Sequence, residues 1–206
     1  SGLCLLGVVG LIVGMNIYQT NQNDELVSSS STRMLTASVE NLLQAKAAEQ
    51  AVRVQKTFGE SLLVVTALAD QVADLRTMAA KRSLEAGVLR EELNQSLKTA
   101  FERNDKVLGI WLAFEPNGLD GKDSEFVDAE AHDATGRFMS YWSWQDGTPK
   151  QDPLKGYEVP GDGDWYLRPR ALKRQTVAEP YNYEIAGKPV LMTGPAVRVY
   201  EGQVRL

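Results

Sequence analysis

The sequence contains little of the chemistry on which most enzymes and metal proteins depend. Cys4 is its one cysteine, so no disulfide bond can form within the chain. His132 is its one histidine, which excludes most metal sites built from imidazole ligands. No P-loop, serine nucleophile elbow, HExxH or GxGxxG motif occurs. We therefore expect neither an enzyme nor a bound cofactor or metal.

Basic residues are also few. The 22 lysines and arginines are outnumbered by 27 acids, which gives a net charge of −5, and they form no basic block. Proteins that bind nucleic acid neutralise phosphates with clustered positive charge. We expect no nucleic-acid partner.

Charged residues are missing from the first 23 positions, and residues 2–17 are almost entirely apolar or glycine. A run of this kind approaches the ~20 residues that cross a bilayer, and Tyr18 suits the membrane interface. We predict a transmembrane helix over residues 1–23 that begins upstream of Ser1. A cleaved signal peptide is the alternative.

Proline is absent from residues 24–106, whereas every proline and tryptophan follows residue 108. Apolar residues in the earlier part recur every three or four positions, which predicts helices with one apolar face. The first helix should run to about Lys81, or roughly 85 Å from the membrane segment. Its stripe is Leu35, Val39, Leu42, Leu62, Val65, Leu68, Val72, Leu75 and Met78. A second helix carries Val88, Leu89, Leu93, Leu97 and Phe101. Residues 24–105 are thus predicted to be a helical stalk, compatible with a coiled-coil homodimer.

The periodicity becomes strand-like after residue 106. Runs typical of strands cover residues 107–114, 136–144, 181–185 and 190–200, and another begins at 203–206. Residues 145–179 read as a long irregular segment, a kind of loop that is often functional. We predict an α+β fold in which residues 106–206 form a PAS-like antiparallel sheet of about five strands, cut before it is complete.

The densest chemical signal is Asp164 directly before Trp165 and Tyr166, with Tyr181 further on. Aromatic faces attract an organic cation and a carboxylate accepts its N–H groups, so this combination suits an amine ligand. The alternative is structural: Trp165 and Tyr166 belong to the core of the sheet and Asp164 caps the turn that follows it.

Acids are concentrated between residues 115 and 133, where Lys122 is the one base. They are Glu115, Asp120, Asp123, Glu125, Asp128, Glu130 and Asp133. The spacing lacks the pattern of a calcium loop, so we expect a solvated acidic face there. We also expect His132 to be a surface or loop residue.

The arrangement of a membrane helix, a long helix and a sheet that carries these residues resembles the double-Cache sensor domain of bacterial methyl-accepting chemotaxis transducers, in particular the receptors for polyamines and biogenic amines. In amino-acid-sensing relatives the pocket contains a Tyr, an Arg two residues before a Trp-Tyr pair, a second Tyr and a later Asp. The resemblance places the first Tyr at Tyr157 and the others at Trp165, Tyr166 and Tyr181. The later Asp would follow Leu206.

The position of the family's Arg is occupied by Gly163, with Asp164 beside it. An Arg binds a carboxylate, so its replacement removes the anchor for the acid end of an amino acid, whereas Asp164 adds an acceptor for an ammonium group. A second acid for a diamine could come from Glu115, Glu158, Asp162 or Glu184.

The resemblance implies a periplasmic amine sensor anchored in the inner membrane, acting as a homodimer and signalling to a cytoplasmic kinase and adaptor. A double-Cache sensor of a histidine kinase and an amino-acid-sensing chemoreceptor are the main alternatives. A carbohydrate-binding module and an amine-processing enzyme are further rivals.

Overall fold

The computed structural model describes the backbone of residues 2–200 and the side chains of residues 30–200. The chain divides into two compact units, residues 1–55 and residues 56–206. Helix α1, Gly2–Arg82, contributes to both, and helix α2, Ala86–Glu102, belongs to the second. Both helices that the sequence predicts within residues 24–105 are present, and the predicted strand at 203–206 lies outside the described residues.

Among the residues that the structure describes, no helix combines the length and the apolarity needed to cross a membrane. The predicted transmembrane segment, residues 1–23, is helical from Gly2 onward, but its side chains lie outside the described set. It therefore stays a prediction.

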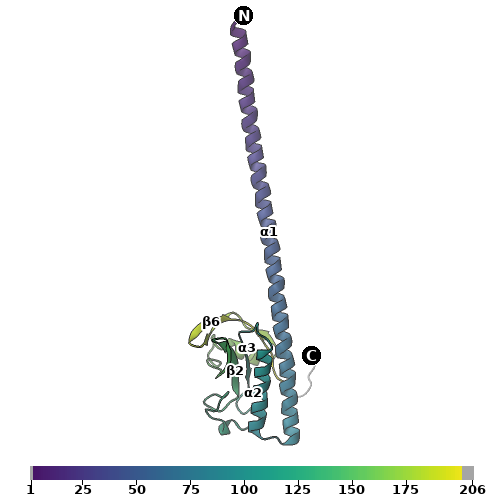
Figure 1. The fold of residues 1–206 in the computed structure, drawn as a ribbon, viewed down its shortest axis with the longest axis vertical. Helices are drawn as coiled ribbons and strands as arrows, with labels where there is room; N and C mark the ends of the chain where they lie inside the picture. Colours follow the sequence, from purple (N-terminus) through teal and green to yellow (C-terminus); the bar gives the residue numbers. More distant parts are fainter. Residues whose placement is uncertain (1, 201–206) are drawn as a thin grey trace. The chain divides into compact units, whose positions relative to one another are not determined.

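In the second unit, α2 lies alongside the C-terminal part of α1 (Figure 1). Leu68 and Val72 of α1 and the α2 stripe from Leu89 to Phe101 are buried in one core cluster, as their spacing predicts. Within this unit, two predicted members of the stripes are instead exposed: Met78 of α1 by 37% and Val88 of α2 by 44%. Each lies one position from a buried residue of the same helix, so the apolar face is slightly rotated from the predicted one.

The main sheet has the order β1-β2-β3, with β1 at Gly109–Ala113, β2 at Met139–Gln145 and β3 at Thr148–Pro153. All pairs are antiparallel. Side chains alternate across β1. Ile110 and Leu112 face the helices, whereas Trp111 and Ala113 face a second cluster that contains Trp165.

The prediction of an irregular segment over residues 145–179 is wrong, because β3, helix α3 (Asp164–Leu172) and the short strand β4 (Thr176–Val177) lie within it. Asp146 and Gly147 both have positive φ and turn β2 into β3 as a two-residue hairpin. Prolines hide this strand in the sequence, but β3 is an edge strand of the described sheet and tolerates Pro149 and Pro153.

The prediction of one sheet of about five strands is also wrong for the described residues, which form three separate sheets. Strand β5, Tyr181–Ile185, pairs with β6, Lys188–Met192, across the predicted turn at Ala186 and Gly187. The run over residues 190–200 is not one strand. It is broken around Gly194 into β6 and β7 (Pro195–Ala196), and β7 pairs with β4.

The acidic segment after β1 is not wholly a solvated face. Buried Arg90 of α2 binds Asp120 and Asp123 at 2.6 and 2.8 Å, next to the short helix η1, Asp123–Glu125. Although burial acts in the opposite direction, the hydrogen bond from Arg90 holds the pKa of Asp120 below its usual range. His132 is buried as well, stacked on Phe126 with ring centroids 5.2 Å apart, so the expectation of a surface position is corrected. The ion pairs of Arg90 thus join the acidic segment to α2.

Candidate functional site

The second unit contains a cavity of about 920 Å³ that runs along β1. It is bordered by α1 between Thr57 and Arg76, by α3 and by residues 192–200. A volume of this size is in the range of small-molecule sites. Three of the five predicted site residues line it, namely Trp165, Tyr166 and Tyr181, whereas Asp164 and Tyr157 do not.

An aromatic cluster forms one part of the cavity wall. Trp165 is buried and its ring lies edge-on to Trp111, with centroids 5.2 Å apart, and stacked on Tyr181 at 6.1 Å. Trp111 comes from β1, Trp165 from α3 and Tyr181 from β5, so three elements bring the rings together. Burial raises the pKa of Tyr181 to about 12. The phenol is therefore neutral at physiological pH, and its face carries the negative quadrupole that attracts cations.

Tyr166 connects this wall to a chain of polar groups. Its hydroxyl accepts a hydrogen bond from Arg137 Nη2 at 2.9 Å and donates one to Glu115 Oε1 at 2.6 Å. Burial, together with the bond to Glu115, raises the pKa of Tyr166 well above its usual range. The proton thus stays on Tyr166 and Glu115 remains an acceptor.

Arg137 is the centre of this chain and is buried. Its guanidinium donates to the carbonyl oxygen of Phe114 from two nitrogens and to Glu158 Oε1 at 2.8 Å, and it lies 5.1 Å from the ring centre of Tyr157. A buried guanidinium with this many partners fixes the groups around it.

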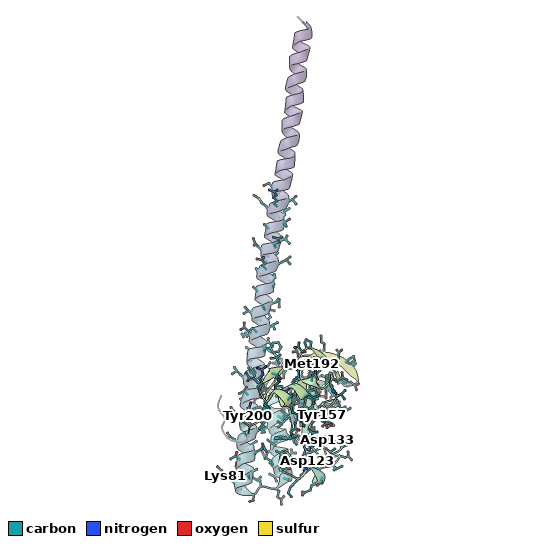
Figure 2. All side chains as sticks on the ribbon, turned by 180° about the vertical axis from the view of Figure 1, so that it is seen from behind. Lys81, Asp123, Asp133, Tyr157, Met192 and Tyr200 are labelled. Atoms are coloured by element: carbon teal, nitrogen blue, oxygen red, sulfur yellow. The ribbon has the colours of Figure 1, made fainter. Side chains whose placement is uncertain are left out.

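Tyr157 takes part through its hydroxyl, which donates to Asp133 Oδ2 (Figure 2, where both residues are labelled). Burial and this hydrogen bond raise the pKa of Tyr157 to about 12. Its ring meets that of Tyr166 edge-on at 5.7 Å. Tyr157 does not line the cavity, but it packs against Tyr166 and thereby supports the cavity wall.

Asp164 begins α3, and its side chain is directed to the backbone. Oδ1 accepts the N–H of Gly161 at 3.0 Å, and the residue is exposed. The carboxylate thus accepts a hydrogen bond from the loop before α3 and not from the turn that follows, so the alternative in which Asp164 caps the following turn is wrong.

Gly163 occupies the position of the family's Arg, and the backbone packs so closely around it that only glycine fits. A Cβ atom there would lie 2.5 Å from the carbonyl oxygen of Tyr157 and 2.6 Å from that of Gly156. Any side chain would force the backbone apart, so the present loop does not accommodate an Arg at this position.

Charge is unevenly distributed around the cavity. Among the described residues that line it, Glu115 is the one carboxylate, and the basic ones are Arg76, Lys106, Arg170, Lys173 and Arg198. Arg76 donates to the carbonyl oxygen of Gly118, and Arg198 lies over the ring of Tyr200. Arg170 binds Glu115 Oε2 at 2.9 Å.

The other candidate acids for a diamine lie elsewhere, because Glu158 binds Arg137 and neither Asp162 nor Glu184 lines the cavity. Trp111 was not singled out as a binding residue by the sequence analysis. The alternation along β1 is the signal for Trp111, because it places residues 111, 113 and 115 on one face.

Taken together, an α+β fold and a cavity lined by aromatic rings and charged side chains are typical of a domain that binds a small molecule. The curated relative reported next is a chemotaxis receptor rather than an enzyme.

The comparisons with known proteins point to the same class. The chain is 37% identical over 210 residues to the methyl-accepting chemotaxis protein TlpQ of Pseudomonas aeruginosa, an alignment that covers 95% of this chain and 29% of that protein. The chain thus spans less than a third of that relative's length. No model of a known protein family matches it.

Among solved structures, the extracellular domain of the putative histidine kinase mmHK1S-Z2 is 27% identical, with a TM-score of 0.50 over 71% of this chain and 55% of that chain. Methyl-accepting chemotaxis protein X is also 27% identical, with a TM-score of 0.46 over 71% of this chain and 58% of that chain. The chain is therefore homologous to sensor domains of chemoreceptors and kinases.

Proposed function

We propose that the chain is the ligand-binding region of a transmembrane chemoreceptor that senses small organic amines, such as putrescine, spermidine or histamine. The observation that carries the proposal is the cavity wall in which Trp111, Trp165 and Tyr181 lie together, with the carboxylate of Glu115 lining the same cavity. Aromatic faces and a carboxylate are the groups that bind an ammonium ion.

Asp164 and Tyr157 have different parts in this proposal. Tyr157 supports the wall through its contacts with Tyr166 and Arg137. Asp164 is exposed at the start of α3 and bears a second carboxylate beside Trp165. Closure of α3 and the preceding loop over a ligand would bring this carboxylate to its cationic group. Closure must be more favourable with ligand than without it for a signal to result.

The rest of the proposal concerns the whole receptor. Residues 1–23 anchor it in the inner membrane, residues 24–105 form the helical stalk, and residues 106–206 form the sensing module in the periplasm. The receptor is a homodimer that signals to a cytoplasmic kinase and adaptor. Within residues 30–55, Leu35, Val39 and Leu42 are 52 to 67% exposed, and a second helix of the same kind would cover such a stripe.

Calorimetric titration of the purified protein with putrescine, spermidine and histamine, and with alanine as control, tests this function. We expect the amines to bind with micromolar affinity and alanine not to bind. Asp164→Asn should weaken the binding of the amines. Asp162→Asn, two residues earlier and also exposed, should leave their affinity unchanged. Binding of alanine without binding of any amine would reverse the assignment.

An amino-acid-sensing receptor is the second candidate, because Arg170 and Lys173 also line the cavity. Either could bind a ligand carboxylate in place of the family's Arg. The sign of the effect of Arg170 substitutions separates the two candidates, as described next.

A further inference from the structure

We infer that Glu115 is the carboxylate that receives the ammonium group of the ligand, and that Arg170 occupies this carboxylate until the ligand replaces it. The inference rests on the proposed amine-sensing function and assigns specific roles in it to Glu115 and Arg170. It makes Arg170 an internal competitor that sets the affinity of the site.

The two oxygens of Glu115 have different partners. Tyr166 donates to Oε1 at 2.6 Å, and Arg170 donates to Oε2 at 2.9 Å. Both charged residues line the cavity, and their side chains are about half exposed, by 45% for Glu115 and 51% for Arg170. A ligand in the cavity can therefore reach the pair.

The hydrogen bond from Tyr166 keeps Glu115 in place during an exchange. Arg137 donates to the hydroxyl oxygen of Tyr166, so the single hydroxyl proton is directed at Glu115. Arg137 is buried and also binds Glu158, so the hydrogen-bond chain from Arg137 through Tyr166 to Glu115 is held in position. Oε1 is thus held by the protein, and Oε2 is the oxygen available to a cation.

Energetics favour the exchange. An ion pair between half-exposed side chains contributes little, because solvent screens it and ordering two side chains is costly. A small amine that enters the cavity gains the same carboxylate and the faces of Trp165 and Tyr181 as well. The Arg170 head group, on a flexible side chain, is free to return to solvent.

The test is the affinity for putrescine of the purified protein and its variants, measured by calorimetry. Arg170→Gln removes the competitor, so we expect about two- to fivefold tighter binding, the factor that corresponds to a half-exposed ion pair. Arg168→Gln is the matched control. Arg168 lies on the same helix, is 47% exposed and forms a comparable pair with Glu179 at 3.4 Å, but it does not line the cavity. We expect it to leave the affinity unchanged.

A double-mutant cycle with Glu115→Gln assigns the effect to the pair. The glutamine keeps an oxygen for Tyr166 but loses the charge, so putrescine should bind at least about tenfold more weakly, in line with the loss of a charge-assisted bond. In that background, Arg170→Gln should have no further effect. Circular dichroism and the unfolding midpoint show whether each variant is folded, and the exposed Arg170→Gln and Arg168→Gln pair decides the matter even if Glu115→Gln is unstable.

The possible failures can be told apart. If the wild-type protein binds none of the amines, the proposed function and the inference both fall. If it binds putrescine and Arg170→Gln has the same affinity as the wild type, the inference alone is wrong. Weaker binding in Arg170→Gln would mean that Arg170 holds an anionic group of the ligand, which also overturns the inference.

Discussion

The rings of Trp165 and Tyr181 lie nearly parallel, with 20° between their planes and 6.1 Å between their centroids. Trp165 lies in the first turn of α3, and Tyr181 is the first residue of β5. A helix and a separate hairpin therefore meet at this contact. Movement of either element changes the aromatic wall. The contact therefore links occupation of the cavity to the arrangement of two elements.

Tyr181→Leu is predicted to weaken putrescine binding by about three- to thirtyfold, because one aromatic face is lost and cation–π contacts contribute about 0.5 to 2 kcal/mol. Tyr183→Leu is the matched control. Tyr183 lies on the same face of β5 and touches Trp165 edge-on at 6.0 Å, but it does not line the cavity. Calorimetry should give the control the affinity of the wild type, and equal losses in both variants would argue against a direct role for Tyr181.

Arg90→Met is predicted to lower the free energy of unfolding by about 3 to 5 kcal/mol, because it leaves the carboxylates of Asp120 and Asp123 buried without their counter-ion. Lys122→Met is the control. Lys122 binds Glu125 on the surface, where solvent screens the ion pair and its contribution to stability is small. Urea denaturation measures both, and a loss below about 1 kcal/mol for Arg90→Met would contradict the buried network.

Gly163→Ala is predicted to destabilise the protein by about 1 to 3 kcal/mol, because the added Cβ meets two backbone carbonyl oxygens. Gly59→Ala should have the opposite sign. Gly59 lies within α1 with no neighbouring atom within 4 Å of an added Cβ, so alanine should stabilise the helix by about 0.5 to 1 kcal/mol. Thermal unfolding compares the two, and a neutral Gly163→Ala would show that the loop has room for a side chain.

Stability should depend on pH through His132. Burial lowers the pKa of this imidazole below that of the unfolded chain, with the nearby Arg90 acting in the same direction. The unfolded state therefore binds more protons as the pH falls below about 6.5, and the folded state loses stability in that range. Between pH 7.5 and pH 5, the unfolding free energy of the wild type should fall further than that of His132→Gln. Parallel curves for the two proteins would contradict this assignment.

The sequence predicted the helices and several strands because their signals are local. The spacing of Leu89, Leu93 and Leu97 marks the buried face of α2, and the Ala186-Gly187 turn marks the β5–β6 hairpin. Strand β3 escaped prediction because Pro149 and Pro153 are unfavourable in strands, and an edge position that tolerates them is set by tertiary structure.

The site was predictable to a similar degree. The adjacency of Trp165 and Tyr166 marked them as candidates, and both line the cavity. The contact of Arg170 with Glu115 joins residues 55 positions apart, from 115 to 170, and depends on the packing of α3 against the end of β1. No local pattern carries that information. The contact of Asp164 with Gly161, in contrast, is local, but it lies on the opposite side from the predicted cap of the following turn.

A crystal structure of the protein with putrescine tests the central claim most directly. We predict an ammonium nitrogen within about 6 Å of the ring centres of Trp165 and Tyr181 and within about 3 Å of a Glu115 oxygen, with Arg170 displaced from that carboxylate. Putrescine bound away from these rings, or a crystal grown at saturating putrescine whose cavity contains none, would contradict the account.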